Sequence, residues 1–300
     1  MSCFRRCAVA VATLTLALCG CGADDTDATP SEPFAILSAF PAEIAPHIER
    51  AKVTETMVID GHVFRVGVLE GVPVVLAMTG IGLVNATMTT RVLLERFAVQ
   101  GIVVSGVAGA SQLLIGDVAV PLAWATSDGT TYTPPPEWLE LSEEIAAAGL
   151  PLEQCTRVPA ASEEPVCLSH EPAVVVGGVG RSSDPFGNQA LRCRVGGGDV
   201  FGCDTDTLAA ASASARRTMG VRAPGDVEFP IVDDMETAAI AREAAARGVP
   251  FIAFRAVSDG PGDPLGLPNF LAQFNAYYSL AARNAAAATV AFLTRVVAGR

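Results

Sequence analysis

The sequence predicts an α/β fold: a single domain of three layers, with helices on both faces of a mixed, mostly parallel central sheet. Short apolar runs alternate with segments of helical periodicity from residue 33 to the C-terminus. Most of these runs are apolar on both faces, as buried parallel strands are. One stretch, 150–232, is rich in Gly, Pro and Cys, and we expect it to form a cysteine-bearing loop expansion of the domain.

Composition and charge exclude several classes of protein. The chain has 300 residues, of which 50% are hydrophobic and 17% charged, so it can bury a large core and is not disordered overall. Its net charge of -12 would repel phosphate backbones, and no nucleic-acid partner is expected. Lys52 is the only lysine, so no phosphate-binding Gly-Lys-Ser/Thr loop exists. With 3 histidines and no His-Glu-x-x-His, we expect neither a metal nor another cofactor.

The N-terminal segment is typical of an export signal. Two arginines precede an apolar run over residues 7–18, which is shorter than the roughly 20 residues that span a membrane. The following Leu-Cys-Gly-Cys resembles a lipoprotein cleavage site, so we expect a lipoprotein-type signal peptide over 1–21 that ends at the anchor Cys21. Cys19 is a second candidate, and an ordinary secretory signal is the alternative. After a polar linker at 22–33, the chain is expected to be lipid-anchored to the bacterial cell envelope.

Four cysteines remain in the loop expansion: Cys155, Cys167, Cys193 and Cys203. An even number of cysteines in an exported chain favours disulfides, and four cysteines allow three pairings. Because neighbours along the chain are closest, we expect the local pairs Cys155–Cys167 and Cys193–Cys203. Free buried thiols are the alternative.

The domain is expected to span residues 34–300, and its first half alternates strands with helices. The predicted strands are 33–39, 55–59, 62–70, 72–79, 101–105 and 116–126. The predicted helices are 41–52, 80–97 and 137–148. Pro41 suits a first helical turn, and apolar residues recur at helical spacing after Gly82. In the second half we expect strands at 173–179, 227–232 and 250–257, and helices at 235–247 and from about 269.

Ligands of such sheets bind beyond the carboxyl ends of the strands. Three acidic side chains follow predicted strands there: Glu43, Glu236 and Asp259. Carboxyl groups that share an apolar cleft acquire different pKa values, which can provide an acid and a base together. Acids also stabilise helix N-termini by roughly 0.3–1 kcal/mol, so a structural role is the alternative for Glu43 and Glu236. For Asp259, the alternative is a role in its Gly/Pro-rich turn.

Four segments together resemble the nucleoside phosphorylase/nucleosidase superfamily. They are 36–43, 79–86 (TGIGLVNA), 105–110 (SGVAGA) with 115–117, and 233–259 (DDMETAAIAREAAARGVPFIAFRAVSD). The chain is most similar to 5′-methylthioadenosine/S-adenosylhomocysteine nucleosidases, from about residue 34 to 297 except for the expansion. The resemblance implies the phosphorylase/hydrolase-like fold, a purine nucleoside as the small-molecule partner, and a homo-oligomer, either a dimer or a hexamer.

The resemblance also implies roles for single residues. Glu43 corresponds to the carboxylate that activates water, and Asp259 to the acid that protonates purine N7, with Ser258 placing it. Met235 and Glu236 correspond to the ribose clamp.

Further residues correspond to the part of the site that contacts the nucleoside. Ala108 and Gly109 correspond to a backbone edge. Phe201, followed by Gly202, fits the family's Gly-Asp-x-Phe and would stack on the base, and Phe186 is the rival for this role.

The sequence favours water over phosphate as the nucleophile. Where phosphorylases of this superfamily carry an arginine and a serine, this chain has Val104 and Val107, which cannot bind a dianion. The nucleosidases usually carry serine at the position of Val107. We interpret Arg91 and Arg255 as structural ion-pairing residues. The expected function is a purine nucleosidase; the alternatives are a phosphate-dependent phosphorylase and a non-catalytic nucleoside-binding or storage-type protein.

Overall fold

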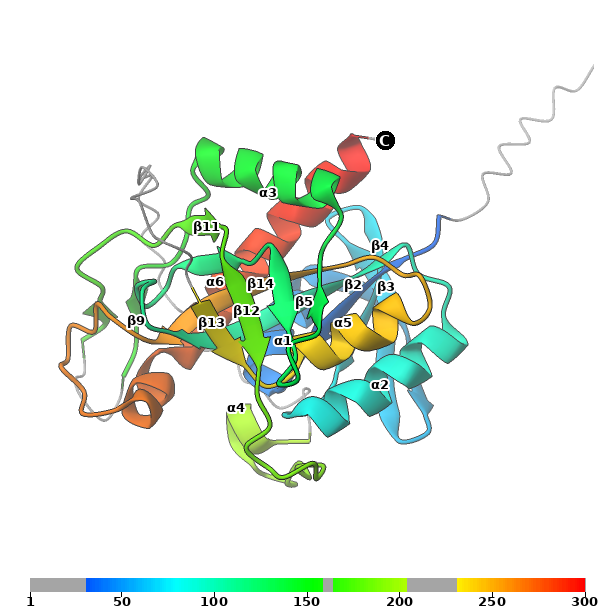
Figure 1. Ribbon diagram of the computed structural model, residues 1–300, viewed down its shortest axis with the longest axis horizontal. Helices are drawn as coiled ribbons and strands as arrows, with labels where there is room; N and C mark the ends of the chain where they lie inside the picture. The colour runs from blue at the N-terminus through cyan, green and yellow to red at the C-terminus, as the bar shows by residue number, and fades with distance from the viewer. Residues whose placement is uncertain (1–30, 159–163, 204–230, 300) are drawn as a thin grey trace, which may run out of the picture. The chain divides into compact units, whose positions relative to one another are not determined.

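The computed structural model describes residues 31–158, 164–203 and 231–299 (Figure 1). The candidate anchors Cys21 and Cys19, and most of the strand predicted at 227–232, lie outside the described residues. From Glu32 onward the chain forms one compact unit. The predicted α/β fold with a mixed sheet is confirmed.

One mixed sheet forms the core of this unit. Its strands are β1 (Phe34–Ser38), β2 (Ala51–Ile59), β3 (His62–Leu69), β4 (Val72–Met78), β5 (Gly101–Ala110), β6 (Val118–Val120), β7 (Ala123–Ala125), β8 (Thr131–Tyr132), β11 (Val174–Val176), β12 (Val179–Ser182), β13 (Ile231–Asp234) and β14 (Phe251–Asp259). They follow the order β2-β3-β4-β1-β5-β13-β12-β7-β8, and β14, β6 and β11 form a branch from β5. The central strands β4, β1, β5 and β14 are parallel, whereas β3 is antiparallel to both of its neighbours, β2 and β4.

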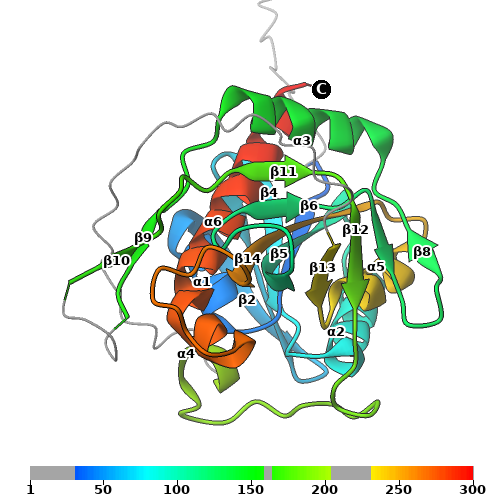
Figure 2. The ribbon, with the colours of Figure 1, turned by 60° about the vertical axis from the view of Figure 1, so that its left-hand side comes forward.

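Helices cover both faces of the sheet (Figure 2). They are α1 (Pro41–Arg50), α2 (Leu83–Arg96), α3 (Pro136–Ala148), α4 (Gly198–Phe201), α5 (Thr237–Ala245) and α6 (Phe270–Ala298). On β1, Ala35 and Leu37 belong to the core shared with α2 and α5, whereas Phe34 and Ile36 belong to the core shared with α1, α3 and α6. A strand buried on both faces must be apolar throughout, which explains why these runs lack polar alternation.

The long helix α6 belongs to the core. By length and composition it could cross a membrane, but 61% of its most apolar stretch is buried inside the protein. Its alanine-rich face lies on β14 and β5, where small side chains let a helix approach a sheet closely.

The central strand β5 positions the candidate site. It runs to Ala110, beyond the end predicted at Ser105, because it has partners along its whole length. β1 pairs with its first half, β14 with nearly all of it, and β13 with its end at Gly109 and Ala110. The segment SGVAGA therefore lies inside a strand rather than in a loop after one.

Two strands that the sequence predicts as continuous are each divided in two. The strand expected at 116–126 is interrupted at Pro121 between β6 and β7, and the strand expected at 173–179 is interrupted at Gly177 and Gly178 between β11 and β12. Proline has no N–H for a ladder, and the two glycines have φ angles of 139° and 71°. The breaks lie side by side, since β6 pairs with β11 and β7 with β12.

Both predicted disulfide pairs are confirmed. Cys155–Cys167 joins β9 (Cys155–Thr156) to β10 (Val166–Cys167), which form a separate two-stranded sheet. Cys193–Cys203 closes a loop that contains the short helix α4.

Candidate active site

Glu43 lies in the first turn of α1, between the end of β1 and the middle of β5. Its side chain is 1% exposed. Its Oε2 accepts a hydrogen bond from the backbone N of Ala39 over 2.6 Å, and its Oε1 accepts one from the backbone N of Val107 over 2.7 Å. Two N–H donors on one carboxylate favour its ionised form. Pro41 suits the first turn of α1, and two residues later Glu43 points back to both strands.

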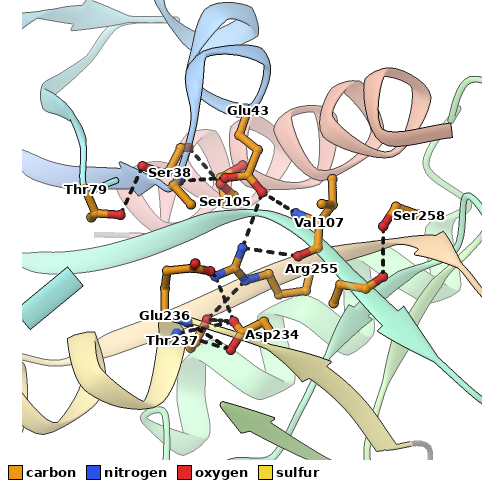
Figure 3. Close-up of polar contacts among 12 residues, drawn as sticks. Ser38, Glu43, Thr79, Ser105, Val107, Asp234, Glu236, Thr237, Arg255 and Ser258 are labelled. Carbon is orange, nitrogen blue, oxygen red and sulfur yellow. Dashed lines mark hydrogen bonds and ion pairs between the residues drawn. The ribbon is translucent and has the colours of Figure 1, made fainter. Parts of the chain in front are cut away.

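Arg255 of β14 connects Glu43 to two further carboxylates (Figure 3). Its Nη1 lies 3.5 Å from Glu43 Oε1, and its Nη2 lies 2.7 Å from Asp234 Oδ2 and 3.1 Å from Glu236 Oε2. Its Nε donates to Thr237 Oγ1 over 3.1 Å. The predicted ion-pairing role is therefore observed, and two of its partners are candidate site residues. One guanidinium for three carboxylates leaves this cluster with an excess of acidic groups.

Asp234 and Glu236 lie at the junction of β13 and α5 and differ in how fully their carboxylate oxygens are hydrogen-bonded within the protein. Asp234 accepts hydrogen bonds from the hydroxyls of Ser182 and Thr237 in addition to its ion pair, so its oxygens are occupied within the protein. Among the described residues, the backbone N of Gly82 is the one hydrogen-bond donor to Glu236 Oε1, over 2.9 Å, and Oε2 faces the guanidinium. Asp234 anchors the cluster, whereas Glu236 retains lone pairs for a ligand.

Asp259 lies at the end of β14, beside the same strand β5. It pairs with Gly109, and the register of the two strands shifts just before it. Such a bulge re-aims the side chain that follows it. Ser258 Oγ donates to Asp259 Oδ1 over 2.7 Å. Gly109 lies two residues from Val107, the residue bound by Glu43, so the two contact points on β5 are about 7 Å apart at the rise of an extended strand.

Two glycines in β5 leave the space that the carboxylate side chains occupy. A Cβ at position 106 would overlap with Glu43 Oε1 and Arg255 Nη1, and a Cβ at position 109 would lie 2.6 Å from Asp259 Oδ2. Side-chain oxygens can therefore approach the strand backbone only because Gly106 and Gly109 lack side chains.

Burial raises the pKa of all three candidate carboxyls. For Glu43, desolvation raises the pKa above its usual range, although Arg255 and the two backbone N–H groups oppose the change. Burial raises the pKa of Glu236 to about 7, against the opposing effect of Arg255. Desolvation also raises the pKa of Asp259, and the Ser258 hydroxyl opposes it. The pKa of Glu236 thus lies where a carboxyl can exchange protons near neutral pH.

The other predicted residues occupy two places. Ala108 and Gly109 lie within β5, where Ala108 O is 3.4 Å from Ser258 Oγ. Met235 lies half-buried between the two acids at the β13–α5 junction. Each of these residues is close to the carboxylate cluster in the chain or in space.

The two candidate stacking residues lie on different segments of the chain. Phe201 and Gly202 lie on the disulfide-closed loop, where they line a small cavity with Ala39, and Phe201 is 47% exposed. The ring of Phe186 lies against Gly82, 3.0 Å from where a Cβ of that glycine would be. Both phenylalanines border the site, and the stacking role of Phe201 stays a prediction.

Sequence reasoning left three contributors out of the site. Arg255 had a signal, because a lone charge inside an apolar strand needs buried carboxylate partners. Asp234 had a weaker one, as the first acid of an Asp-x-Glu at a strand end. The contact of Gly82 with Glu236 had none, since the two are brought together only by the fold. Within the part of the chain that the structure describes, no group of three or more His, Cys, Asp or Glu side chains is arranged to hold a metal ion.

The fold and the buried acidic cluster define the class of this protein. The sequence pattern of the phosphorylase superfamily matches residues 33–294, and the chain belongs to that superfamily.

Several relatives match nearly the whole domain. The chain is 30% identical over 269 residues to the 5′-methylthioadenosine/S-adenosylhomocysteine nucleosidase of Geobacillus thermodenitrificans, covering 87% of this chain and 96% of that protein. It is 28% identical over 265 residues to the nucleosidase of the same name from Shewanella denitrificans, covering 87% and 98%. An uncharacterized protein of Mycobacterium tuberculosis is 37% identical over 186 residues, covering 55% of this chain and 74% of that protein.

Solved structures show the same fold. The 5′-methylthioadenosine/S-adenosylhomocysteine nucleosidase of Neisseria meningitidis, in complex with methylthio-immucillin-A, has a TM-score of 0.60 at 21% identity, covering 88% of this chain and 99% of that chain. The futalosine hydrolase of Helicobacter pylori has a TM-score of 0.59 at 21% identity, covering 88% and 98%. At these identities the likeness concerns the fold.

Proposed function

We propose that this protein is a purine nucleosidase that hydrolyses the N-glycosidic bond of adenine-type nucleosides, such as 5′-methylthioadenosine or S-adenosylhomocysteine. One observation carries the proposal: Glu43 and Asp259 both contact β5, at residues that are two positions apart. Arg255 also links Glu43 to Glu236. The nucleosidases among its relatives support the choice of substrate class.

The chemistry divides among the three carboxyl groups. Breaking the bond leaves positive charge on the sugar while electrons flow into the purine, and a carboxyl pair can divide the proton transfers, as in glycosidases. Protonated Asp259, with its raised pKa, donates to the leaving base at N7. Ionised Glu43 accepts a proton from the water that attacks the sugar carbon. Glu236 binds the sugar hydroxyls through the lone pairs that its protein contacts leave free.

Water is the proposed nucleophile because the site offers little to a phosphate dianion. Val104 and Val107 supply no side-chain donors, and the guanidinium of Arg255 already faces three carboxylates. A dianion would need cationic or amide donors, and the surplus of acids would repel it.

The test is release of adenine from adenosine and from 5′-methylthioadenosine by the purified protein, in phosphate-free buffer and then with added phosphate. We expect equal release in both buffers. Release that strictly requires phosphate would make the protein a phosphorylase. Tight binding without release in either buffer would make it a binding protein on the same fold.

A further inference from the structure

The Cys193–Cys203 loop covers one side of the candidate site. We call residues 191–203 the cap. Its residues Val200 and Phe201 line a cavity together with Ala39 and Ile81 of the main domain. The cavity measures about 20 Å³, whereas small-molecule sites occupy roughly 300–1,000 Å³. A space that holds about one water can take part of a nucleoside only when the cap lifts.

The cap is built as a small unit. The disulfide joins its ends, and inside it the backbone N of Arg194 donates to Phe201 O over 2.7 Å. The backbone N of Gly202 donates to Gly198 O over 3.0 Å. The guanidinium of Arg194 lies 5.8 Å from the centre of the Phe201 ring, within cation–π range. These links keep Phe201 attached to the rest of the cap when the cap moves.

Among the residues that the structure describes, hydrogen bonds connect the cap to the domain at two points. Asn85 Nδ2 of α2 donates to Leu191 O over 2.7 Å, and Tyr278 Oη of α6 donates to Asp199 Oδ2 over 3.3 Å. Much of the cap is open to solvent: Val195 is 90% exposed, and Phe201, which lines the cavity, is still 47% exposed. A segment with little buried surface is expected to open at low cost in free energy.

The sugar end of a nucleoside would lie under the cap, and this step rests on the proposed function. Ala39, which lines the cavity, binds Glu43 through its backbone N. Gly82, next to cavity residue Ile81, binds Glu236. Asp259, proposed to contact the base, lies beyond, against Gly109. With the base directed to Asp259 and the hydroxyls to Glu236, the 5′ carbon is the sugar position left to face the cap.

We propose that the disulfide-closed cap selects nucleosides by the size of their 5′ substituent. Compact 5′ groups, as in adenosine and 5′-methylthioadenosine, need only a small displacement of Val200 and Phe201, and Phe201 then covers the 5′ end instead of stacking on the base. The amino-acid chain of S-adenosylhomocysteine is too long for this space and holds the cap away from the domain. Among the nucleosides of the proposed function, those with short 5′ ends are therefore the preferred substrates, and S-adenosylhomocysteine is a poor one.

The experiment compares kcat and KM for adenosine and S-adenosylhomocysteine in the wild type and in Cys193→Ser/Cys203→Ser. In the wild type, kcat/KM should favour adenosine by about tenfold or more, mainly through KM. Without the disulfide, the preference for adenosine should shrink several-fold, because kcat/KM for S-adenosylhomocysteine rises. The matched control is Cys155→Ser/Cys167→Ser, which removes the disulfide outside the cap and should leave the preference unchanged. Equal preference in all three proteins would overturn the proposal.

A second variant avoids the disulfide, whose loss can impair folding. Tyr278→Phe keeps the ring but removes the hydroxyl that binds Asp199, and it should shift the preference in the same direction as the loss of the disulfide. If no protein releases adenine from either compound, the proposed function fails, and titration calorimetry of both compounds then tests the cap. Binding that favours adenosine in the wild type but not in the cap variant supports selection by the cap; unchanged preference, or no binding of either compound, overturns it.

Discussion

At the scale of single residues, Asp259 can be tested without disturbing its surroundings. Its protein partner is the Ser258 hydroxyl, which can turn to suit an amide. Asp259→Asn should therefore lower kcat by about 10²–10⁴-fold, since the proton donor is lost, while the thermal unfolding midpoint stays near that of the wild type. The matched control is Asp233→Asn, a neighbouring exposed acid paired with Arg181, which should keep full turnover. Full turnover in Asp259→Asn would remove this residue from the chemistry.

The glycines of β5 give a second prediction. Gly109→Ala places a methyl group against Asp259 Oδ2, at the flexible end of a half-buried side chain. We expect a large loss of kcat with a modest loss of stability, because the carboxyl can move but no longer points correctly. Gly106→Ala instead meets fully buried Glu43 and Arg255, and should cost much more stability. Denaturant unfolding with steady-state kinetics separates the two, and equal effects in both variants would contradict this account.

Arg255 provides the third prediction. Arg255→Met leaves three carboxylates buried without their cation, and breaking such a network by removing one partner typically costs about 3–5 kcal/mol of unfolding free energy. Arg91→Met is the control, since Arg91 is mostly exposed and Glu243 keeps its contact with Arg242. Urea unfolding should show a large loss in the first variant and a small one in the second. A small loss in both would show that the cluster does not depend on Arg255.

At the scale of elements, α1 is docked on β5 through a buried histidine. His47 Nε2 lies 2.8 Å from Ser105 Oγ, and burial lowers the pKa of His47 from 6.5 to about 3. The folded state holds His47 neutral while the unfolded chain protonates it below pH 6.5, so stability is lost as the pH falls from 6.5 toward 3. Compared with His47→Gln, the wild type should lose roughly 2 kcal/mol between pH 7 and pH 5. Parallel pH dependence of unfolding in both proteins would contradict this assignment.

Local patterns predicted most elements, and their failures have physical causes. Runs apolar on both faces identified β1, β4, β5 and β14, because a strand between two helix layers needs no polar side. The two divided strands were not predicted from the sequence, although Pro121 and Gly177-Gly178 mark the breaks. The division depends on strand pairing, because β6 pairs with β11 and β7 with β12, and that pairing is not visible in a single segment. The end of β5 was placed too early because its glycine-rich second half is weak strand sequence that pairing with β13 and β14 stabilises.

The site was predictable to the extent that its residues lie in recognisable segments. Glu43, Glu236 and Asp259 each follow a strand; the structure brings Glu43 and Asp259 to β5 and links Glu236 to Glu43 through Arg255. Arg255 was recognised as an ion-pairing residue, but its partners come from α1 and the β13–α5 junction, far away in the chain. Contacts of this kind depend on tertiary packing and leave no local periodicity.

At the scale of the whole molecule, the two disulfides bear on the compartment in which the protein works. Disulfides persist in oxidising compartments and are rare in the cytosol. Together with the signal-like segment over residues 7–18, they support the proposal that the protein is exported to the cell envelope. Salvage of external nucleosides would suit an enzyme in this location.

The proposed lipid anchor at Cys21 can be tested by membrane fractionation and mass spectrometry. A diacyl modification at Cys21 would hold the protein stably on a membrane, because two chains bind far more tightly than one. Expressed in a bacterium that processes lipoproteins, the wild type should fractionate with membranes and carry the lipid mass on an N-terminal Cys21. Cys21→Ser should move it to the aqueous fraction with its kinetics unchanged, since the folded domain begins near residue 32. Cys19→Ser is the matched control and should stay with the membrane. Lipid on residue 19, or an unmodified N-terminus, would contradict the assignment and favour the second candidate or an ordinary secretory signal.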